Sequence, residues 1–332
     1  MPYLFFNIEF KITIAENIVF DVLETLWIEN SIEKFSDAAK VTLPREFKNA
    51  RKGNSGLSFY GKNLLESINV GDAIKIEVGY NGNLDTEFEG YITEIGAEIP
   101  LLIECEDEMY QLKKANKLSK TFSKISLKEL LKFIAPAYDI EALDVNLGKF
   151  MINNATPYEV ITALKEQYGI RCYFKGKVLH AGLLIDMKPA SNHDFVFGRN
   201  IRESSDLKYL SKEKRQKKFI AVSLQKGTSK KLKSEYGENI NGEVTVHAPV
   251  GLTQTELNDW VKKQHDSQVF EGYNGSVDGW LIPRVKAQDS IQLEDPNYTN
   301  KYRNGRYFVE AVTLTADATT GVKRKNKISF KL

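Results

Sequence analysis

One segment of the chain comes close to the spacing of a phosphate-binding loop. Gly56–Asn63 reads GLSFYGKN, so two glycines and a lysine are correctly spaced, but asparagine stands where such a loop needs serine or threonine to hold magnesium. Leu57, Phe59 and Tyr60 are bulky at positions where backbone amides must curl around a phosphate. No helix signature follows, so we interpret the segment as a loop that leads into a strand.

The cysteines and histidines lack the spacings of a metal site or a catalytic nucleophile. Cys105 and Cys172 lie far apart in apolar runs, which is neither a disulfide framework nor a zinc motif, and we expect both thiols to be reduced and buried. The sequence has no HxxxH, HExxH or GxSxG pattern around its four histidines, which are His180, His193, His247 and His265. It therefore predicts no catalytic residue, no cofactor and no metal ion.

Carboxylates are dense just before residue 110, and a pair of them is one candidate for the acid and base of a glycosidase. Glu104 and Glu106 alternate with Ile103 and Cys105, so both glutamates point to one face of a strand. We prefer to interpret them as part of a solvated or lumen-facing acidic row. The candidate lining residues are Glu89, Glu94, Glu104 and Glu106.

Charge is segregated along the chain although the net charge is only +2. Residues 81–112 contain nine acidic residues and no lysine or arginine, whereas residues 199–233 contain twelve basic residues and three acidic ones. A nucleic-acid site would need interleaved aromatic residues, and only Tyr209 and Phe219 are near. We interpret the basic stretch as a solvated or protein-docking segment, with the candidate docking residues Arg215, Lys217, Lys218, Lys230 and Lys231.

Strand patterns dominate the first 110 residues, which alternate apolar and polar side chains. Four further strands are predicted at 39–44, 72–80, 88–96 and 101–106, and several short strands in so few residues indicate a small barrel or sandwich. The N-terminus lacks the pattern of a signal peptide and no 18 apolar residues run together, so we expect a soluble protein made in the cytoplasm, without membrane insertion.

The pattern of apolar and polar residues changes near residue 113. Ser126 with Glu129, and Thr156 with Glu159, form capping boxes ahead of apolar helical repeats, so residues 114–188 predict a small α/β domain. Strand patterns return from residue 189, interrupted by one helix at about 253–270. The predicted fold is mainly β with an α+β insert, in which two related small β-barrels, residues 1–113 and 189–332, flank the α/β domain.

An internal repeat relates the two β-rich parts. Gly71–Ile76 resembles Gln288–Leu293, and Tyr91–Glu94 resembles Tyr307–Glu310 at nearly the same distance downstream. Two copies of one barrel have a geometric use, because three chains around an axis would present six similar modules. A trimer of this kind can meet a hexamer without any catalytic residue.

The order of these motifs resembles the phage late control protein D family, the baseplate hub proteins of contractile tails. The segments are SDAAKVTLP at 36–44, GDAIKIEVGY at 71–80, FEGYITEI at 88–95 and CEDEMYQLKK at 105–114. The second half matches more loosely, and Gln288 stands where the family usually has glycine before the aspartate. The basic insert at 226–242 has no counterpart that we can place.

The resemblance implies a homotrimeric ring that joins a hexameric tail tube to a separate spike protein and contacts other baseplate proteins. It predicts a non-enzymatic hub of a phage tail or a related injection particle, with an acidic lumen through which DNA or effector cargo slides. The alternatives are a tail-associated cell-wall hydrolase acting through Glu104, and a carbohydrate-binding protein with exposed aromatics near Trp27, Trp260 or Trp280.

Overall fold

The computed structural model describes residues 7–16, 18–43, 64–183, 188–202, 205–225, 230–298, 303–317 and 319–332. About half of the chain is β-strand and helices are few, which confirms the predicted mainly β class. Among the described residues, no helix is long and apolar enough to cross a membrane.

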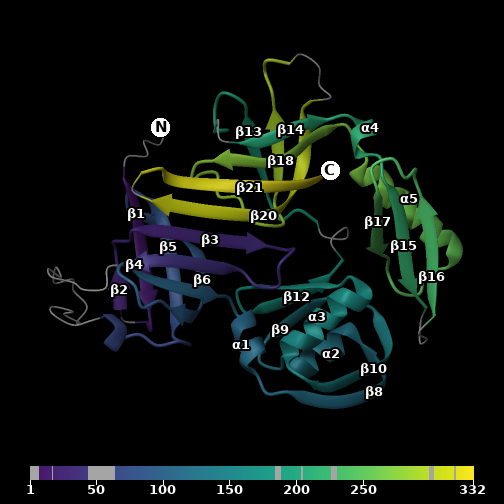
Figure 1. Ribbon diagram of the computed structural model, residues 1–332, viewed down its shortest axis with the longest axis horizontal. Helices are drawn as coiled ribbons and strands as arrows, with labels where there is room; N and C mark the ends of the chain where they lie inside the picture. The colour runs from purple at the N-terminus through teal and green to yellow at the C-terminus, as the bar shows by residue number, and fades with distance from the viewer. Residues whose placement is uncertain are drawn as a thin grey trace.

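Thirteen of the described strands form one continuous sheet that contains the first and the last of them, β1 and β21 (Figure 1). β19 (Ser290–Glu294) branches from β20, and β13 (Asn192–Val196) pairs with β19. The main path runs, in order, β14 (Asp206–Leu210), β18 (Gly272–Gly279), β21 (Gly321–Lys331), β20 (Gly305–Asp317), β3 (Thr25–Ser31), β4 (Ala38–Leu43), β7 (Leu101–Glu106), β6 (Asn83–Ile95), β5 (Ala73–Tyr80), β1 (Ile8–Ile14) and β2 (Ile18–Phe20).

This sheet does not close on itself among the described strands, so the structure does not contain the closed barrels that the sequence predicts. The reason is the antiparallel pairing of β3 with β20, which joins the N-terminal and C-terminal strands edge to edge. Hydrogen bonds that would close each half on itself are instead used between the halves.

The same strand order occurs twice in the sheet. We call β3–β7 module 1, and β14 with β18–β21 module 2. Module 1 is ordered β5-β6-β7-β4-β3 and module 2 is ordered β19-β20-β21-β18-β14, with every neighbouring pair antiparallel. The internal repeat predicted around Asp72 and Asp289 is therefore present in the pairing of the strands.

The turns that precede β5 and β19 match atom by atom. In module 1 the Gly71 amide donates to the Ile92 carbonyl (2.8 Å), and in module 2 the Gln288 amide donates to the Val309 carbonyl (2.9 Å). Gly71 has φ +99°, and Gln288 adopts the same left-handed region at φ +75°. The departure from glycine at position 288 has therefore left the turn geometry unchanged.

A second match runs across the width of each module. In module 1 a row of opposed residues comprises Glu94, Glu104, Lys40 and Trp27 on four successive strands. The corresponding row in module 2 comprises Ala311, Lys327, Ser276 and Asp206. β6 and β20 also share a register shift at the same step, between Ile92 and Glu94 and between Val309 and Ala311, and β20 has a second shift between Tyr307 and Val309. The two rows give a residue-by-residue correspondence between the modules.

The middle of the chain has its own apolar core, and we call residues 109–183 the middle unit. Both predicted capping boxes are present, at the starts of α2 and α3. Its elements are α1 (Met109–Lys114), β8 (Leu118–Ser126), α2 (Leu127–Ile134), β9 (Asp139–Ala142), β10 (Asn146–Ala155), α3 (Pro157–Tyr168), β11 (Arg171–Lys175) and β12 (Val178–Gly182). β8 pairs with β10, and the other three strands form the sheet β11-β12-β9.

Strands that the sequence groups with the second barrel form a separate small sheet, ordered β16-β15-β17 and covered by α5. Buried Phe219, Leu257 and Val261 fill the space between the sheet and the helix. The predicted helix at about 253–270 is α5, and Thr253 and Glu256 form its capping box. The elements are β15 (Lys218–Leu224), β16 (Lys231–Tyr236), β17 (Glu243–His247) and α5 (Gln254–Gln268); η1 (Leu64–Glu66) and α4 (Lys212–Arg215) are single turns elsewhere.

The matched turns give a stability prediction. The Asp289 carboxylate accepts from the Lys286 amide (2.9 Å) and lies 3.0 Å from His193 Nε2, whereas Asp72 accepts from the Asn69 amide (2.8 Å) at a more exposed turn. We expect Asp289→Ala to lower the free energy of unfolding by about 1–3 kcal/mol, because it removes an acceptor that is almost fully buried. Asp72→Ala should lower the free energy of unfolding by a smaller amount. Urea unfolding followed by circular dichroism measures both, and equal losses would contradict this ranking.

Candidate functional site at the junction of the modules

The two modules share a core along the pairing of β3 with β20. Thr25–Ser31 lie opposite Ala311–Asp317 without interruption. Leu314 and Val322 of module 2 are buried in the same apolar cluster as Ile28 and Phe88 of module 1. The modules are therefore held by backbone hydrogen bonds and by a common interior, so they cannot separate without exposing both.

A buried ionic cluster lies at this junction. Glu87 of β6 contacts two arginines of the C-terminal part: Arg324 of β21 at 2.8 Å from its Oε1, and Arg284 of the loop after β18. The side chains of Glu87 and Arg324 are only 5% and 3% exposed. Arg324 also donates to the backbone carbonyls of Leu281 (3.3 Å) and Val285 (3.0 Å). The Glu87 carboxylate thus bridges the two guanidinium groups, and Arg284 also pairs with Asp85 of β6 (2.7 Å) and donates to the Val78 carbonyl of β5 (2.6 Å).

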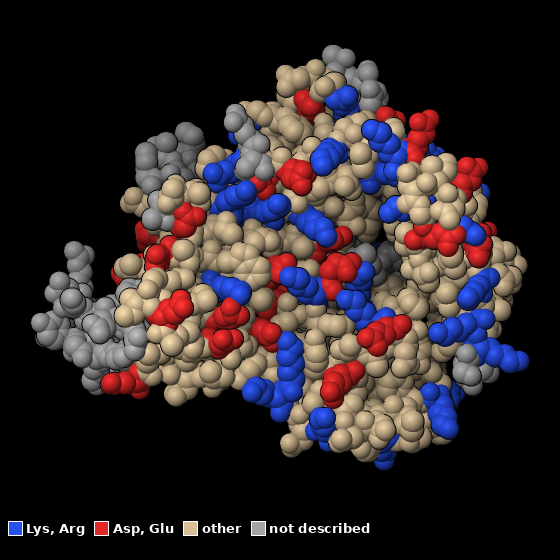
Figure 2. Space-filling view, viewed as in Figure 1, with Lys and Arg blue, Asp and Glu red and all other residues tan. Residues whose placement is uncertain are grey.

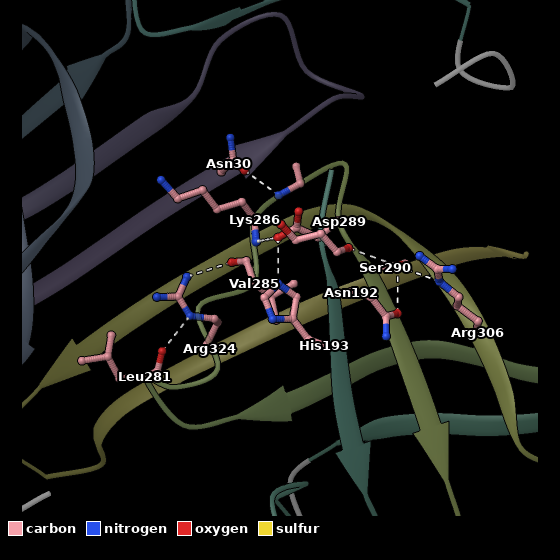
Figure 3. A network of polar contacts seen from close by, with 12 residues as sticks. Asn30, Asn192, His193, Leu281, Val285, Lys286, Asp289, Ser290, Arg306 and Arg324 are labelled. Atoms are coloured by element: carbon pink, nitrogen blue, oxygen red, sulfur yellow. Dashed lines mark hydrogen bonds and ion pairs between the residues drawn. The ribbon is translucent and has the colours of Figure 1, made fainter. Parts of the chain in front are cut away.

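A second polar contact crosses the junction through Asn30, which lies on β3 (Figure 3). Its side-chain amide donates to Asp37 Oδ2 (2.5 Å), and its carbonyl oxygen accepts from the backbone amide of Ala287 (2.6 Å). Two residues after Ala287, the Asp289 carboxylate contacts the His193 ring, as Figure 3 also shows. Asn30 therefore connects the β3–β4 turn of module 1 to the turn before β19.

Polar contacts attach the middle unit to this junction. Tyr173 donates to the side-chain carbonyl of Gln288 (3.0 Å), and Lys175 contacts the same oxygen. Glu108 accepts from Tyr91 of module 1 (3.1 Å) and from Tyr138 of the middle unit (2.8 Å), and it pairs with Lys177. Gln288, which occupies the position of Gly71 in the matching turn, thus provides a side chain that anchors the middle unit to module 2.

Two neighbouring aspartates are perturbed at the edge of this network. Burial raises the pKa of Asp37, and the negative charge of Asp107 raises it further. Burial also raises the pKa of Asp107, although it accepts from the Met109 amide (3.0 Å) and the Ser36 hydroxyl (2.9 Å). The pair is positioned by the β3–β4 turn and by the start of α1, so its protonation depends on module 1 keeping its shape.

A cavity of about 780 Å³ opens between the modules and the middle unit. Buried apolar side chains such as Ile28, Phe88 and Leu314 contribute to its lining. Charged residues of both signs, including Asp37, Glu108, Lys175, Lys177 and Lys286, also line it. The cavity therefore lies between three parts of the chain and combines an apolar lining with charges of both signs.

Three of the four glutamates in the predicted acidic row lie beside lysines. Glu104 pairs with Lys40 at 2.5 Å, Glu106 with Lys113 at 2.7 Å, and Glu89 lies 3.7 Å from Lys75. Glu94 is exposed at the end of β6. On the face shown in Figure 2, acidic and basic side chains lie beside one another instead of in separate fields. Lysines from neighbouring strands and from α1 thus offset charge that looks segregated in the sequence.

The predicted basic residues divide into two groups. Arg215 points inward, where its guanidinium donates to the Tyr273 carbonyl (2.8 Å) and stacks 4.1 Å from the Phe270 ring centroid. Lys218 pairs with Glu235 at 2.5 Å. Lys217, Lys230 and Lys231 are exposed, the last of them on β16.

Other candidates from the sequence have ordinary structural roles. Cys105 and Cys172 are buried free thiols as expected, and burial raises the pKa of Cys172 to about 12. Trp280 is half exposed, but the Arg202 guanidinium lies 4.4 Å from its ring centroid. Gly56–Asn63 lies outside the described residues. Within the described parts of the chain, no group of three histidine, cysteine or acidic residues is placed to hold a metal ion.

Sequence reasoning missed the junction residues Glu87, Asn30 and Arg284. A signal for its fourth member, Arg324, exists in β21: Val322, Arg324, Asn326 and Ile328 alternate with exposed positions, and all four are buried. A charged side chain in the apolar phase of a strand indicates a buried partner, although the sequence does not say which one.

No protein-family model and no curated protein matches this sequence. Solved structures do match its fold. The 43 kDa tail protein of prophage MuSo2 from Shewanella oneidensis is 13% identical with a TM-score of 0.63, and the match covers 97% of this chain and 98% of that one. A tail protein from Neisseria meningitidis is also 13% identical, with a TM-score of 0.62 and coverage of 98% and 97%.

A third match is the E. coli c3393 protein, a component of the type VI secretion system. It is 9% identical with a TM-score of 0.57, over 96% of this chain and 76% of that one, and it is described as similar to the phage T4 tail proteins gp27 and gp5. The fold of this chain is therefore the fold of phage tail and type VI secretion proteins, which agrees with the predicted resemblance to baseplate hubs.

The ionic cluster gives a mutational prediction. We expect Glu87→Ala to destabilise the chain by about 3–5 kcal/mol, because it leaves the buried Arg324 without its carboxylate partner, while Arg284 keeps its ion pair with Asp85 (2.7 Å). Glu104→Ala is the matched control, since it removes a more exposed glutamate of the same module and should cost less than about 1 kcal/mol. Denaturant unfolding compares the two. Similar losses of unfolding free energy in the two variants would mean that the ionic cluster does not stabilise the junction.

The aspartate pair gives a pH prediction. The pKa of Asp37 is raised from 3.8 to about 7, so the folded chain binds this proton more tightly than the unfolded chain does. The pair's contribution to stability is therefore greatest at low pH and is lost as the pH rises toward 7. We expect the stability difference between wild type and Asp37→Asn to change between pH 5 and pH 8, in the direction that favours wild type at pH 5. A difference that stays constant with pH would contradict the raised pKa.

Proposed function

We propose that this chain is a structural hub subunit of a contractile phage tail or a related injection particle. The observation that carries the proposal is the repeated strand order, in which two matched modules share one sheet within a single chain. The fold shared with phage tail proteins and a type VI secretion component supports the same class of function. The particle baseplate is the location where such a subunit would act.

Duplication suggests how the subunit would work. Three chains around an axis would place six similar modules in a ring, with one face suited to a hexameric tail tube and the other to a trimeric spike made by a separate chain. The open sheet of each chain would pair with the sheet of the next chain, so that three sheets form one closed ring and cover the edges that meet there. DNA or effector cargo would pass through the ring, and other baseplate proteins would surround it.

We do not extend this proposal to a strongly acidic lumen. Glu89, Glu104 and Glu106 already lie beside lysines, so a surface built from them would carry mixed charge. Mixed charge is compatible with a passage that does not retain cargo, because neither sign dominates. The role is mechanical, and it asks no chemistry of the junction residues.

The mass of the assembled protein in solution tests the proposal. Each chain has a mass of 37.7 kDa, and we expect native mass spectrometry at rising protein concentration to show a species of three chains. Assembly should be concentration-dependent, because ring closure gains all three interfaces at once. Glu87→Ala should reduce this species, since the junction sets the angle between the modules. A chain that remains monomeric at high concentration, or one that forms only dimers, would contradict the proposed hub.

A further inference from the structure

We propose that β14 of one chain pairs with the end of β6 in the next chain, in the register that β3 and β20 use within one chain. This inference rests on the proposed trimer and names the surfaces that would form it. Within the chain, β3 is bonded to β4 on one edge and to β20 on the other. β14 holds the place of β3 in module 2, and among the described strands it pairs only with β18.

The receiving edge follows from the same comparison. β21 occupies one edge of β20, so β19 and β3 must share the opposite edge, along residues 305–308 and 311–317. In module 1, β7 occupies one edge of β6, and β5 covers the opposite edge only as far as Tyr91. No described strand pairs with that edge at Glu94 or Ile95. The matching residues of β20, from Ala311 onward, are the ones that pair with β3.

The matched rows fix the register. Trp27 corresponds to Asp206, so Glu29 and Ser31 correspond to Lys208 and Leu210 on the same strands. Ser31 lies opposite Ala311, and Ala311 corresponds to Glu94. Leu210 of one chain would therefore lie opposite Glu94 of the next, and Lys208 would lie opposite Gly96. Beyond Gly96 the chain leaves the strand conformation, so the pairing is short.

Charge favours this pairing over others. Lys208 and Glu94 are both exposed, and neither forms an ion pair among the described residues. In the proposed register they are diagonal neighbours on one face of the sheet, within reach of a long side chain. Glu94 belongs to the acidic stretch at 81–112 and Lys208 to the basic stretch at 199–233. Attraction between chains would give a use to the segregation of charge along the sequence.

The contact is head to tail, since β14 and β6 are different surfaces. Such contacts build a closed ring when the rotation between neighbours is one third of a turn. Repetition of the internal β3–β20 junction at each contact would place successive modules at similar angles. A second copy of this chain is therefore the occupant that fits the β14 edge.

Cysteine cross-linking tests the register. The variant Leu210→Cys with Glu94→Cys should form disulfide-linked dimers and trimers on mild oxidation, seen on a non-reducing gel. Ser31→Cys with Ala311→Cys is the positive control, because those positions hold the same register inside one chain and should link without a change in mass. Tyr236→Cys with Glu94→Cys is the negative control, since Tyr236 is on the edge of the separate small sheet.

Charge reversal provides an independent measurement. Lys208→Glu and Glu94→Lys should each weaken trimer formation by roughly two- to fivefold per interface, and the double reversal should restore it. Restoration and Leu210–Glu94 cross-links together support the pairing. A trimer that forms normally but gives cross-links only with the Tyr236 control, or none, would overturn the pairing and leave the proposed function standing. A chain that never assembles would contradict both.

Discussion

The structure depends on the backbone hydrogen bonds between β3 and β20. This single strand pairing converts two halves of a chain into one sheet and prevents either half from closing on itself. Strand pairing fixes both distance and direction, so the relative position of the two modules is set by the backbone. Every polar contact at the junction, from Glu87 with its arginines to Asn30 with Ala287, acts on a geometry that this pairing already defines.

Burial of charged side chains at the junction carries a desolvation cost that apolar side chains would not have. Glu87 and Arg324 lose nearly all contact with water, and two backbone carbonyls are needed to satisfy Arg324 as well. An ion cluster of this kind tolerates only one arrangement of its partners.

The sequence predicted the repeat because its turns are local features. Asp72 and Asp289 are each followed by an alternating strand, and the capping boxes at Ser126, Thr156 and Thr253 lie within four residues of sequence. Glu87 could not be assigned to Arg324 in this way, since more than 200 residues separate them and many acidic residues compete. Closed barrels were predicted for a related reason: alternation identifies strands, but it does not say which edges pair.

The charge pattern shows a similar limit. The acidic stretch and the basic stretch are separated in sequence, yet Lys40, Lys75 and Lys113 reach Glu104, Glu89 and Glu106 once the strands are adjacent. Only the register of the sheet reveals that Glu94 remains outside these pairs. The linear charge pattern therefore did not predict these ion pairs, because they depend on which elements are adjacent in the fold.

The most direct measurement of the central claim is electron microscopy of the isolated assembly viewed along its axis. Two matched modules in each of three chains predict a ring whose projection has six similar lobes and true threefold symmetry, so that the rotational spectrum shows a strong sixfold component. A ring with three lobes and no sixfold component would contradict the claim that the duplicated sheet lets three chains present six equivalent modules.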